Sequence, residues 1–385
     1  MSASGDRTWQ VVVVQNDSAE VLAERLLRVI DEGRRIATYK LALLMALIDC
    51  CAAGADSNGR APSQLHTRDI ARQVLQLYLP QVRLYLGATE NPKQLRQITQ
   101  SNSVALRAVL RLHLLAESTG IKSVAGIALR LPSEYEQCLD VIEQAFARYP
   151  IRLLQTVGKE NRPFLYEFDW TGSVSLKALH SPGGGVLRFK PGAADHLLRL
   201  APLLRPLIEL HWTRMVAQLN QIATEDQRLH DHLFGVERTA FPKTLRAGLM
   251  DLQRGRCFYC NSQLGVSTQV DHFVPWSRWP NNAMENLVLA DSCNSHKSDY
   301  LPAMKHVENW SQRFVQSSVD LSQLAAESNW ESSPTRSLSL ARTCYAHLPH
   351  GTPFWLLARD FVEDNPAKIT EALHHVALPT TSTGQ

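Results

Sequence analysis

The sequence has no apolar run long enough to cross a membrane, and its cysteines do not form an even set. The segment Leu41–Ile48 is too short to span a bilayer, and Lys40 and Asp49 bound it. No charged and then apolar leader opens the chain, so we expect no membrane partner. Seven irregularly spaced cysteines argue against a disulfide framework. These features predict a cytoplasmic protein with reduced thiols.

Strong net charge and internal repeats are also missing. The formal net charge is only +3, which permits nucleic-acid binding without indicating it. A content of 44% hydrophobic and 20% charged residues is that of an ordinary globular protein and argues against a disordered one. A chain of 385 residues is long enough for two or three domains.

Hydrophobic spacing predicts an α+β protein with four regions. Residues 1–150 form a mainly α-helical N-terminal domain, for which we expect a DNA-recognition or regulatory role. Residues 151–235 form a small strand-containing and helical connector. Residues 236–312 form a domain that contains the cysteine pair and the ordered polar residues described below. Residues 313–385 form a helical extension with a polar tail.

Individual elements follow from the same spacing. We expect helices over 19–31, 39–51, 67–85, 103–117, 133–149, 193–222, 224–234, 242–253, 315–327 and 367–376, and strands over 164–170 and 186–190. Pro80 should break or kink the 67–85 helix, and Pro202 and Pro206 should kink the 193–222 helix. The helix–loop–helix of 39–85 has two interpretations. It is either a helix-turn-helix DNA reader with a long connecting loop or a pair of plain core helices.

One segment carries an ordered set of polar residues. Asp271 and His272 end an apolar run, Asn286 follows 14 residues after the histidine, Asn294 comes eight residues later, and Lys297 three after that. A carboxylate and an amide oxygen are suitable ligands for Mg²⁺, which prefers oxygen. A neutral imidazole can accept a proton from water near neutral pH. The set therefore indicates a metal-dependent phosphodiesterase site, in which Asp271 and Asn294 hold the ion and His272 is the base.

Local structure gives these residues a geometry. Residues 267–271 and 286–290 read as two strands, and a helix begins near Cys293, capped by Asp291 or Ser292. Successive strand residues point to opposite sides, so Asp271 and His272 must lie where the first strand ends. We expect Asn286 to tie the 273–285 loop and orient the His272 ring. Lys297, one turn along the helix, is expected to reach a phosphate.

These residues resemble the HNH endonuclease family, the ββα-metal nucleases, over roughly 240–310. The similarity extends to the HNH module of RNA-guided CRISPR effector nucleases, especially in Asn294-x-x-Lys297-Ser-Asp-x-x-Pro. The resemblance implies that His272 is the general base, that Asn286 is structural, and that Asn294 binds the catalytic Mg²⁺ or Mn²⁺ with Asp271. The final motif position is Asn here rather than His. More distantly, the flanking regions resemble bacterial defence-associated HNH proteins, which implies restriction or anti-phage work.

The cysteines near the motif depart from the family pattern. Many HNH domains carry two Cys-x-x-Cys pairs that hold a structural zinc. Here Cys257 and Cys260 form the first pair, but Ala290 stands where the second would begin, which leaves Cys293. Three thiolates do not complete a tetrahedral Zn²⁺ site. Either Asp291 or His296 supplies a fourth ligand, or the cysteines pack as small apolar groups.

Three functions remain open at this point. The first is a DNA endonuclease that nicks as a monomer or makes double-strand breaks as a dimer. The second is a nucleic-acid-binding module that kept the scaffold and lost the chemistry. The third is an RNA-cleaving HNH nuclease. The oligomeric state and any partner proteins of a defence system cannot be read from the sequence.

Overall fold

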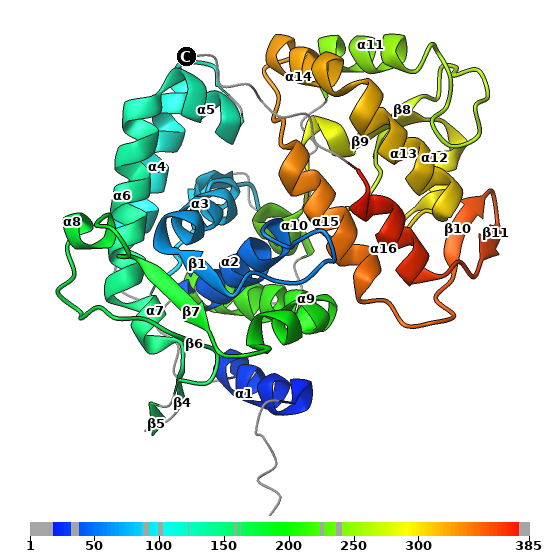
Figure 1. The fold of residues 1–385 in the computed structure, drawn as a ribbon. Coiled ribbons are helices and arrows are strands. Elements are labelled where there is room, and N and C mark those ends of the chain that lie inside the picture. The colour runs from blue at the N-terminus through cyan, green and yellow to red at the C-terminus, as the bar shows by residue number, and fades with distance from the viewer. Residues whose placement is uncertain are drawn as a thin grey trace, which may run out of the picture.

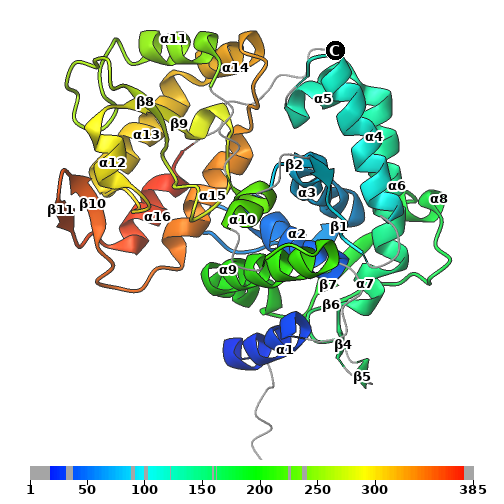
Figure 2. The ribbon, with the colours of Figure 1, turned by 180° about the vertical axis from the view of Figure 1, so that it is seen from behind.

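The computed structural model describes residues 18–31, 38–87, 92–98, 103–121, 123–157, 160–161, 163–223, 227–235 and 241–376. Within these ranges the protein is α+β, 57% helical with small sheets, as expected from the sequence. Figures 1 and 2 show the elements up to residue 235 gathered on one side of the molecule and the elements after 241 on the other. The polar tail at 377–385 and the expected residues 224–226 of one helix lie outside the described residues.

The helices of the N-terminal half are α1 (Ala19–Asp31), α2 (Tyr39–Ala53), α3 (Thr67–Tyr78), η1 (Pro80–Val82), α4 (Val104–Ser118), α5 (Val124–Arg130), α6 (Pro132–Arg148), α7 (Pro150–Leu153), α8 (Leu176–Leu179), α9 (Ala193–Asn220) and α10 (Gln227–Phe234). Those of the C-terminal half are α11 (Lys243–Leu252), η2 (Met284–Asn286), α12 (Ser292–Lys297), α13 (Met304–Gln316), α14 (Ser318–Glu327), α15 (Pro334–Ala346) and α16 (Pro366–His374).

The strands are short and antiparallel. They are β1 (Gln64–His66), β2 (Leu84–Tyr85), β3 (Lys93–Gln94), β4 (Thr156–Val157), β5 (Glu160–Asn161), β6 (Tyr166–Glu167), β7 (Val186–Phe189), β8 (Gln269–His272), β9 (Leu287–Ala290), β10 (Phe354–Leu357) and β11 (Asp360–Val362). In the N-terminal half they form a three-stranded sheet in the order β1-β7-β6 and two small hairpins. In the C-terminal half, β8 pairs with β9 and β10 with β11.

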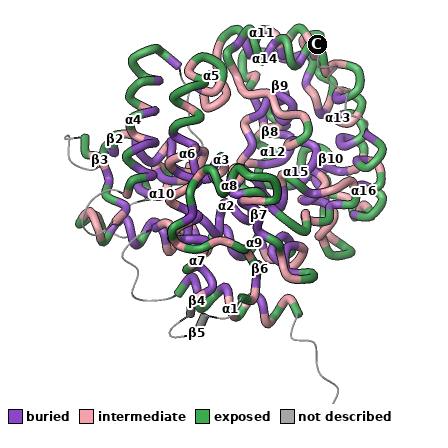
Figure 3. Tube along the Cα trace, turned by 60° about the vertical axis from the view of Figure 1, so that its left-hand side comes forward, coloured by how far each residue is buried: buried purple, intermediate pink, exposed green. Residues whose placement is uncertain are grey.

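Helix α2 is the centre of the N-terminal core. Every residue from Leu41 to Ala52 is buried, and α3, α7, α9 and α15 pack around the helix. Figure 3 shows this burial as the purple centre of the molecule. The carboxylate of Asp49 is buried in this core, and it forms an ion pair with the buried guanidinium of Arg205 from α9, which compensates its charge. An amino-acid run that is apolar on all sides forms a helix surrounded by other elements, so α2 is a core helix, as one of the two interpretations of 39–85 expects.

Several expected elements differ in their ends. The third helix stops at Tyr78 rather than at residue 85, because Pro80 cannot continue it and opens η1 instead. Helix α9 runs through Pro202 and Pro206. The expected strand 164–170 shrinks to Tyr166–Glu167, and β1 lies in the connection between the expected helices 39–51 and 67–85. Helices α5, α13 and α15 were not predicted from the sequence.

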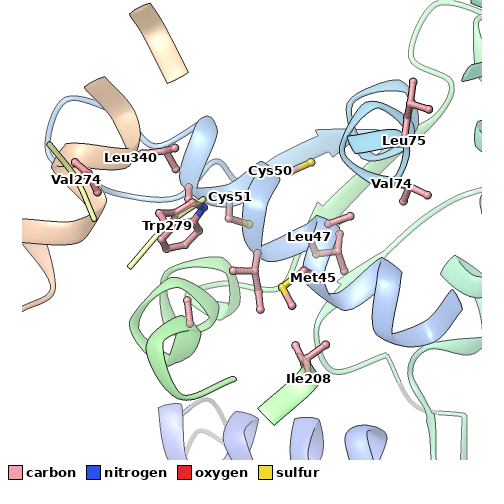
Figure 4. Packing of buried hydrophobic residues seen from close by; sticks show 14 of the residues in the cluster. Met45, Leu47, Cys50, Cys51, Val74, Leu75, Ile208, Val274, Trp279 and Leu340 are labelled. Carbon is pink, nitrogen blue, oxygen red and sulfur yellow. The ribbon is translucent and has the colours of Figure 1, made fainter. Parts of the chain in front are cut away.

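The two halves share one hydrophobic core. Figure 4 shows Trp279, from the loop after β8, beside Cys51 of α2 and Leu340 of α15. The Arg205 guanidinium lies 5.2 Å from the centre of the Trp279 ring. In α15, Ser339 Oγ donates to the Ala55 carbonyl at 3.2 Å, which also links the halves. The loop that leads out of the motif is thus packed on the N-terminal half. No helix in the described part of the chain has the length and apolar character needed to cross a bilayer.

Candidate functional site

The motif residues lie on a small ββα unit. Strand β8 pairs with β9 in the register Gln269↔Ala290 to His272↔Leu287, and the backbone turns directly after His272. All four residues of β9 are buried, which places this strand inside the unit. Helix α12 follows at once, and Asp291 caps it by accepting a hydrogen bond from the Cys293 amide at 3.3 Å. The expected order of strand, loop, strand and helix is therefore the observed one.

Asp271 is held by two neighbours and is nearly buried, with 7% of its surface exposed. Its Oδ2 accepts a hydrogen bond from the Tyr259 hydroxyl at 2.6 Å and lies 3.3 Å from the Lys297 ammonium. Burial raises the pKa of Asp271, and the Lys297 charge and the Tyr259 hydroxyl oppose this rise. The other oxygen, Oδ1, has no hydrogen-bond partner among the described residues. One oxygen of the carboxylate is thus fixed by Tyr259 and Lys297, and the other has no partner within the described residues.

Asn294 lies on the same face of the unit as Asp271. Its Nδ2 donates to Gln269 Oε1 at 2.6 Å, and Gln269 is two residues from Asp271 along β8, so both strand side chains point to one side. Lys297, one turn further along α12, reaches Asp271 on that side. Within the described part of the chain, Asn294 Oδ1 has no hydrogen-bond partner. Asp271, Asn294 and Gln269 therefore lie on one face of the unit, where the Gln269 oxygen already accepts the Asn294 amide.

His272 ends β8, and its ring is held by a residue outside the predicted set. Its Nε2 lies 2.7 Å from Oδ1 of Asn282 in the 273–285 loop. With that amide oxygen as acceptor, Nε2 carries the proton and Nδ1 keeps its lone pair. Burial lowers the pKa of His272, while the Asn282 hydrogen bond and the neighbouring Asp271 charge act to raise it. The aromatic rings of Trp276 and Phe241 lie 5.5 and 6.3 Å from the imidazole.

Asn286 braces the loop but does not touch the His272 ring. Its Oδ1 accepts from the Val274 amide at 2.8 Å, and its Nδ2 donates to the Val274 and Asn281 carbonyls at 3.1 and 3.0 Å. The two ends of the 273–285 loop are therefore joined through this fully buried amide. The loop-tying geometry expected of Asn286 is present, whereas the ring is oriented by Asn282.

Lys297 is placed differently from our expectation. Its side chain is completely buried, and its ammonium donates to the His272 and Ser298 carbonyls at 3.0 and 3.4 Å and faces Asp271. Burial lowers the pKa of Lys297, and the Asp271 charge opposes this. The Lys297 ammonium thus has a protein oxygen near each of its three N–H groups. The expected phosphate contact does not fit this placement, because a phosphate would have to displace internal partners.

Three cysteines and an aspartate meet beside this face. Ligand atoms of Cys257, Cys260, Cys293 and Asp291 all lie within 4.8 Å of one another. A Zn²⁺ ion at about 2.3 Å from each sulfur would separate the sulfurs by about 3.8 Å, so the cluster has the right size for such an ion. The turn that holds the first pair is tied to β9 by the hydrogen bond from Phe258 N to the Leu289 carbonyl at 3.0 Å. His296 is exposed and is not among the clustered ligands.

Sequence reasoning missed three contributors to the site. Gln269 could have been found from strand alternation, since it is two residues before Asp271. Tyr259 lies between the paired cysteines, and its hydroxyl donates a hydrogen bond to Asp271. Asn282 follows Pro280-Asn281 in a loop, where asparagine is common in turns, so nothing in the spacing singled it out.

Comparison with protein families matches two segments of the chain. Residues 257–303 match the model described as HNH endonuclease, which confirms the resemblance found in the motifs. Residues 19–233 match the model described as Domain of unknown function (DUF8808). None of the curated proteins and none of the solved structures matches the chain. Because the second model covers more than half of the sequence, the chain belongs to the DUF8808 family, and an HNH endonuclease segment follows this domain.

Proposed function

We propose that this protein is a metal-dependent endonuclease that hydrolyses phosphodiester bonds in DNA. The observation that supports this most strongly is the arrangement at the end of β8. Asp271 and Asn294 lie on the face shared by β8 and α12, and each has one side-chain oxygen without a hydrogen-bond partner among the described residues. His272 follows Asp271 directly and keeps a ring nitrogen without a hydrogen-bond partner among the described residues. A pure binding module would not need a base beside a cation site.

The donor set fits a hard divalent cation. Carboxylate and amide oxygens are the ligands that Mg²⁺ and Mn²⁺ accept, and Mg²⁺ keeps several waters when few protein ligands are present. Asp271 and Asn294 are the proposed ligands, and Gln269 lies close enough to Asn294 to assist. When bound, the cation would counter the charge that builds on the phosphate oxygens and stabilise the departing ribose oxygen.

The chain's own residues then have separate tasks. His272 Nδ1 accepts the proton of the attacking water, because Nε2 is already engaged with Asn282. Asn286 keeps the loop after β8 in place through its hydrogen bonds to Val274. Lys297 balances the charge of Asp271 in a buried position, and we assign it this supporting task in place of a phosphate contact.

We also propose that Cys257, Cys260, Cys293 and Asp291 hold a structural Zn²⁺ ion. The cluster size fits, and Asp291 takes the place of the cysteine that the family pattern has at position 290. Such an ion would join the Cys-x-x-Cys turn to the start of α12, which carries Asn294. It would thereby stabilise the fold around the catalytic face without entering the reaction.

Cleavage of a supercoiled plasmid tests the nuclease proposal. With Mg²⁺ or Mn²⁺ the protein should convert supercoiled plasmid to nicked or linear product, and EDTA should stop it. His272→Ala should lower the rate by a factor on the order of 10²–10⁴ while DNA affinity is retained. Asn309→Leu is the matched control, because Asn309 is an exposed residue of α13. Equal cutting by His272→Ala and wild type would contradict the role of the base.

The same assay separates the other two functions. Retained DNA binding with no cleavage under any divalent cation would favour the binding module. Preferential degradation of single- or double-stranded RNA over DNA would favour an RNA nuclease, since a metal-activated water attacks either backbone.

A role in restriction or anti-phage defence, and a cytoplasmic location, remain our proposals from the sequence. Expression of the wild-type and His272→Ala proteins in a bacterial host, followed by phage plaque counts, tests the defence role. Protection by the wild type alone would support it, and equal plaque counts would contradict it.

A further inference from the structure

The His272 ring is fixed by one side chain, and that side chain is not part of the HNH motif. Asn282 Oδ1 lies 2.7 Å from His272 Nε2. An imidazole rotates about its χ2 bond over a broad range, so a partner on one ring nitrogen sets both the ring orientation and the tautomer. Asn282 supplies that partner from the middle of the 273–285 loop.

Asn282 is itself held by its neighbours in the C-terminal half. Its carbonyl accepts a hydrogen bond from Trp330 Nε1 at 2.7 Å. The preceding residue, Asn281, is fully buried and donates from Nδ2 to Ser337 Oγ of α15 at 3.0 Å. Arg336 of α15 donates to the Pro280 carbonyl at 3.3 Å. The backbone on the N-terminal side of Asn282 thus rests on α15.

The same loop is anchored in the N-terminal half by Trp279. Only 4% of the Trp279 surface is exposed. Figure 4 shows the indole among side chains of α2 and α15, next to Cys51 and Leu340. The Arg205 guanidinium of α9 lies over the ring and pairs with Asp49 of α2. The position of the loop, three residues before Asn282, is therefore set by the DUF8808 segment.

We propose that Asn282 is a positioning residue for the His272 base, and that the N-terminal helical region fixes the loop that carries it. This inference rests on the proposed nuclease function. Its consequence is that the HNH segment does not complete its catalytic geometry alone. The packing of Trp279 against α2 and α9 couples the N-terminal region to the base.

Substitution of Asn282 gives the direct test. Asn282→Leu keeps a similar volume and removes the acceptor oxygen, whereas Asn282→Asp keeps an oxygen at the same place. We expect Asn282→Leu to lower kcat roughly 10- to 100-fold with KM changed less than about threefold, because misplacing a catalytic group by about 1 Å costs that much. Asn282→Asp should retain kcat within about fivefold. Asn309→Leu serves as the control for an Asn-to-Leu change on the surface.

A double-mutant cycle separates positioning from general stability. If Asn282 acts through His272, then adding Asn282→Leu to His272→Ala should cause no further loss of the residual rate. A further loss equal to that in the wild-type background would overturn the proposal, as would an unchanged kcat in Asn282→Leu. Failure of the nuclease proposal is recognised separately, since His272→Ala and wild type would then behave alike.

Substitution of Trp279 tests the coupling to the N-terminal half. We expect Trp279→Leu to lower kcat about tenfold without a matching rise in KM, and the loss should vanish in the Asn282→Leu background. Trp279→Phe replaces it if the leucine variant does not fold, with a smaller loss expected. A folded variant with wild-type kcat, or a loss fully additive with that of Asn282→Leu, would overturn the coupling.

Discussion

Replacing Lys297 by methionine decides between a structural ammonium and a phosphate contact. The Lys297 side chain is fully buried, and its ammonium serves Asp271 Oδ2 and two backbone carbonyls. Methionine fills a similar volume and removes the charge. Asp271 would then keep only the Tyr259 hydroxyl on that side. Removing one member of a buried ion pair costs about 3–5 kcal/mol, because the other charge is left without compensation.

The size of this loss should depend on pH. Burial already raises the pKa of Asp271, and Lys297 is the first of the groups that oppose the rise. Without Lys297 the folded protein would bind a proton on Asp271 that the unfolded chain, with a pKa near ~3.9, releases at neutral pH. Stability of the variant should therefore fall as pH rises above that value, by about 1.4 kcal/mol per pH unit until the folded pKa is passed.

Urea unfolding of the metal-free protein at pH 5 and pH 8 measures both effects. The difference from wild type should be larger at pH 8, and Lys368→Met, an exposed lysine of α16, should change little at either pH. Unfolding free energies within about 0.5 kcal/mol of wild type, together with a raised KM for DNA, would refute this reasoning. That result would restore the phosphate contact first expected from the sequence.

Three further predictions concern the zinc cluster, acid stability and the shared core. Metal analysis of the wild type should find one equivalent of zinc, and a wild-type protein without zinc would contradict the site. Asp291→Ala should lose this zinc, whereas Asp291→Cys should keep it. Burial lowers the pKa of His232 to about 4. The free energy of unfolding should therefore fall by up to about 3 kcal/mol as the pH drops from about 6.5 towards 4. In urea unfolding, the His232→Leu variant should show a weaker dependence of this free energy on pH. A profile as steep as that of the wild type would refute this assignment. Trp279→Ala should lower the free energy of unfolding by about 3–5 kcal/mol, whereas Val266→Ala at an exposed position should change it little in the same assay.

Local sequence patterns predicted most of the helices in the N-terminal half. An amphipathic stripe indicates a helix buried on one face, and an all-apolar run indicates a helix buried on every side. The helix at Ala19–Asp31 and the buried helix α2 appear as expected. Helix α15 was missed because its Ser- and Thr-rich sequence has little apolar periodicity of its own. Its buried serines, Ser337 and Ser339, are satisfied by hydrogen bonds to Asn281 and Ala55, which only the folded chain brings near.

The candidate site also has one part that the sequence determined and another that only the tertiary structure decided. The sequence by itself determined the chemical groups and their local frame: Asp271, His272, Asn294 and the strand, loop, strand and helix that carry them. Those residues are close in sequence, so spacing and strand alternation define their approximate arrangement. Only the tertiary structure decided that Lys297 is buried against Asp271, that Asn282 holds the imidazole, and that Asp291 joins the cysteines. The reason is physical: partners for buried charges and ring nitrogens come from whichever segments the core brings together, and Trp279 shows that this core includes helices more than 200 residues away in the chain.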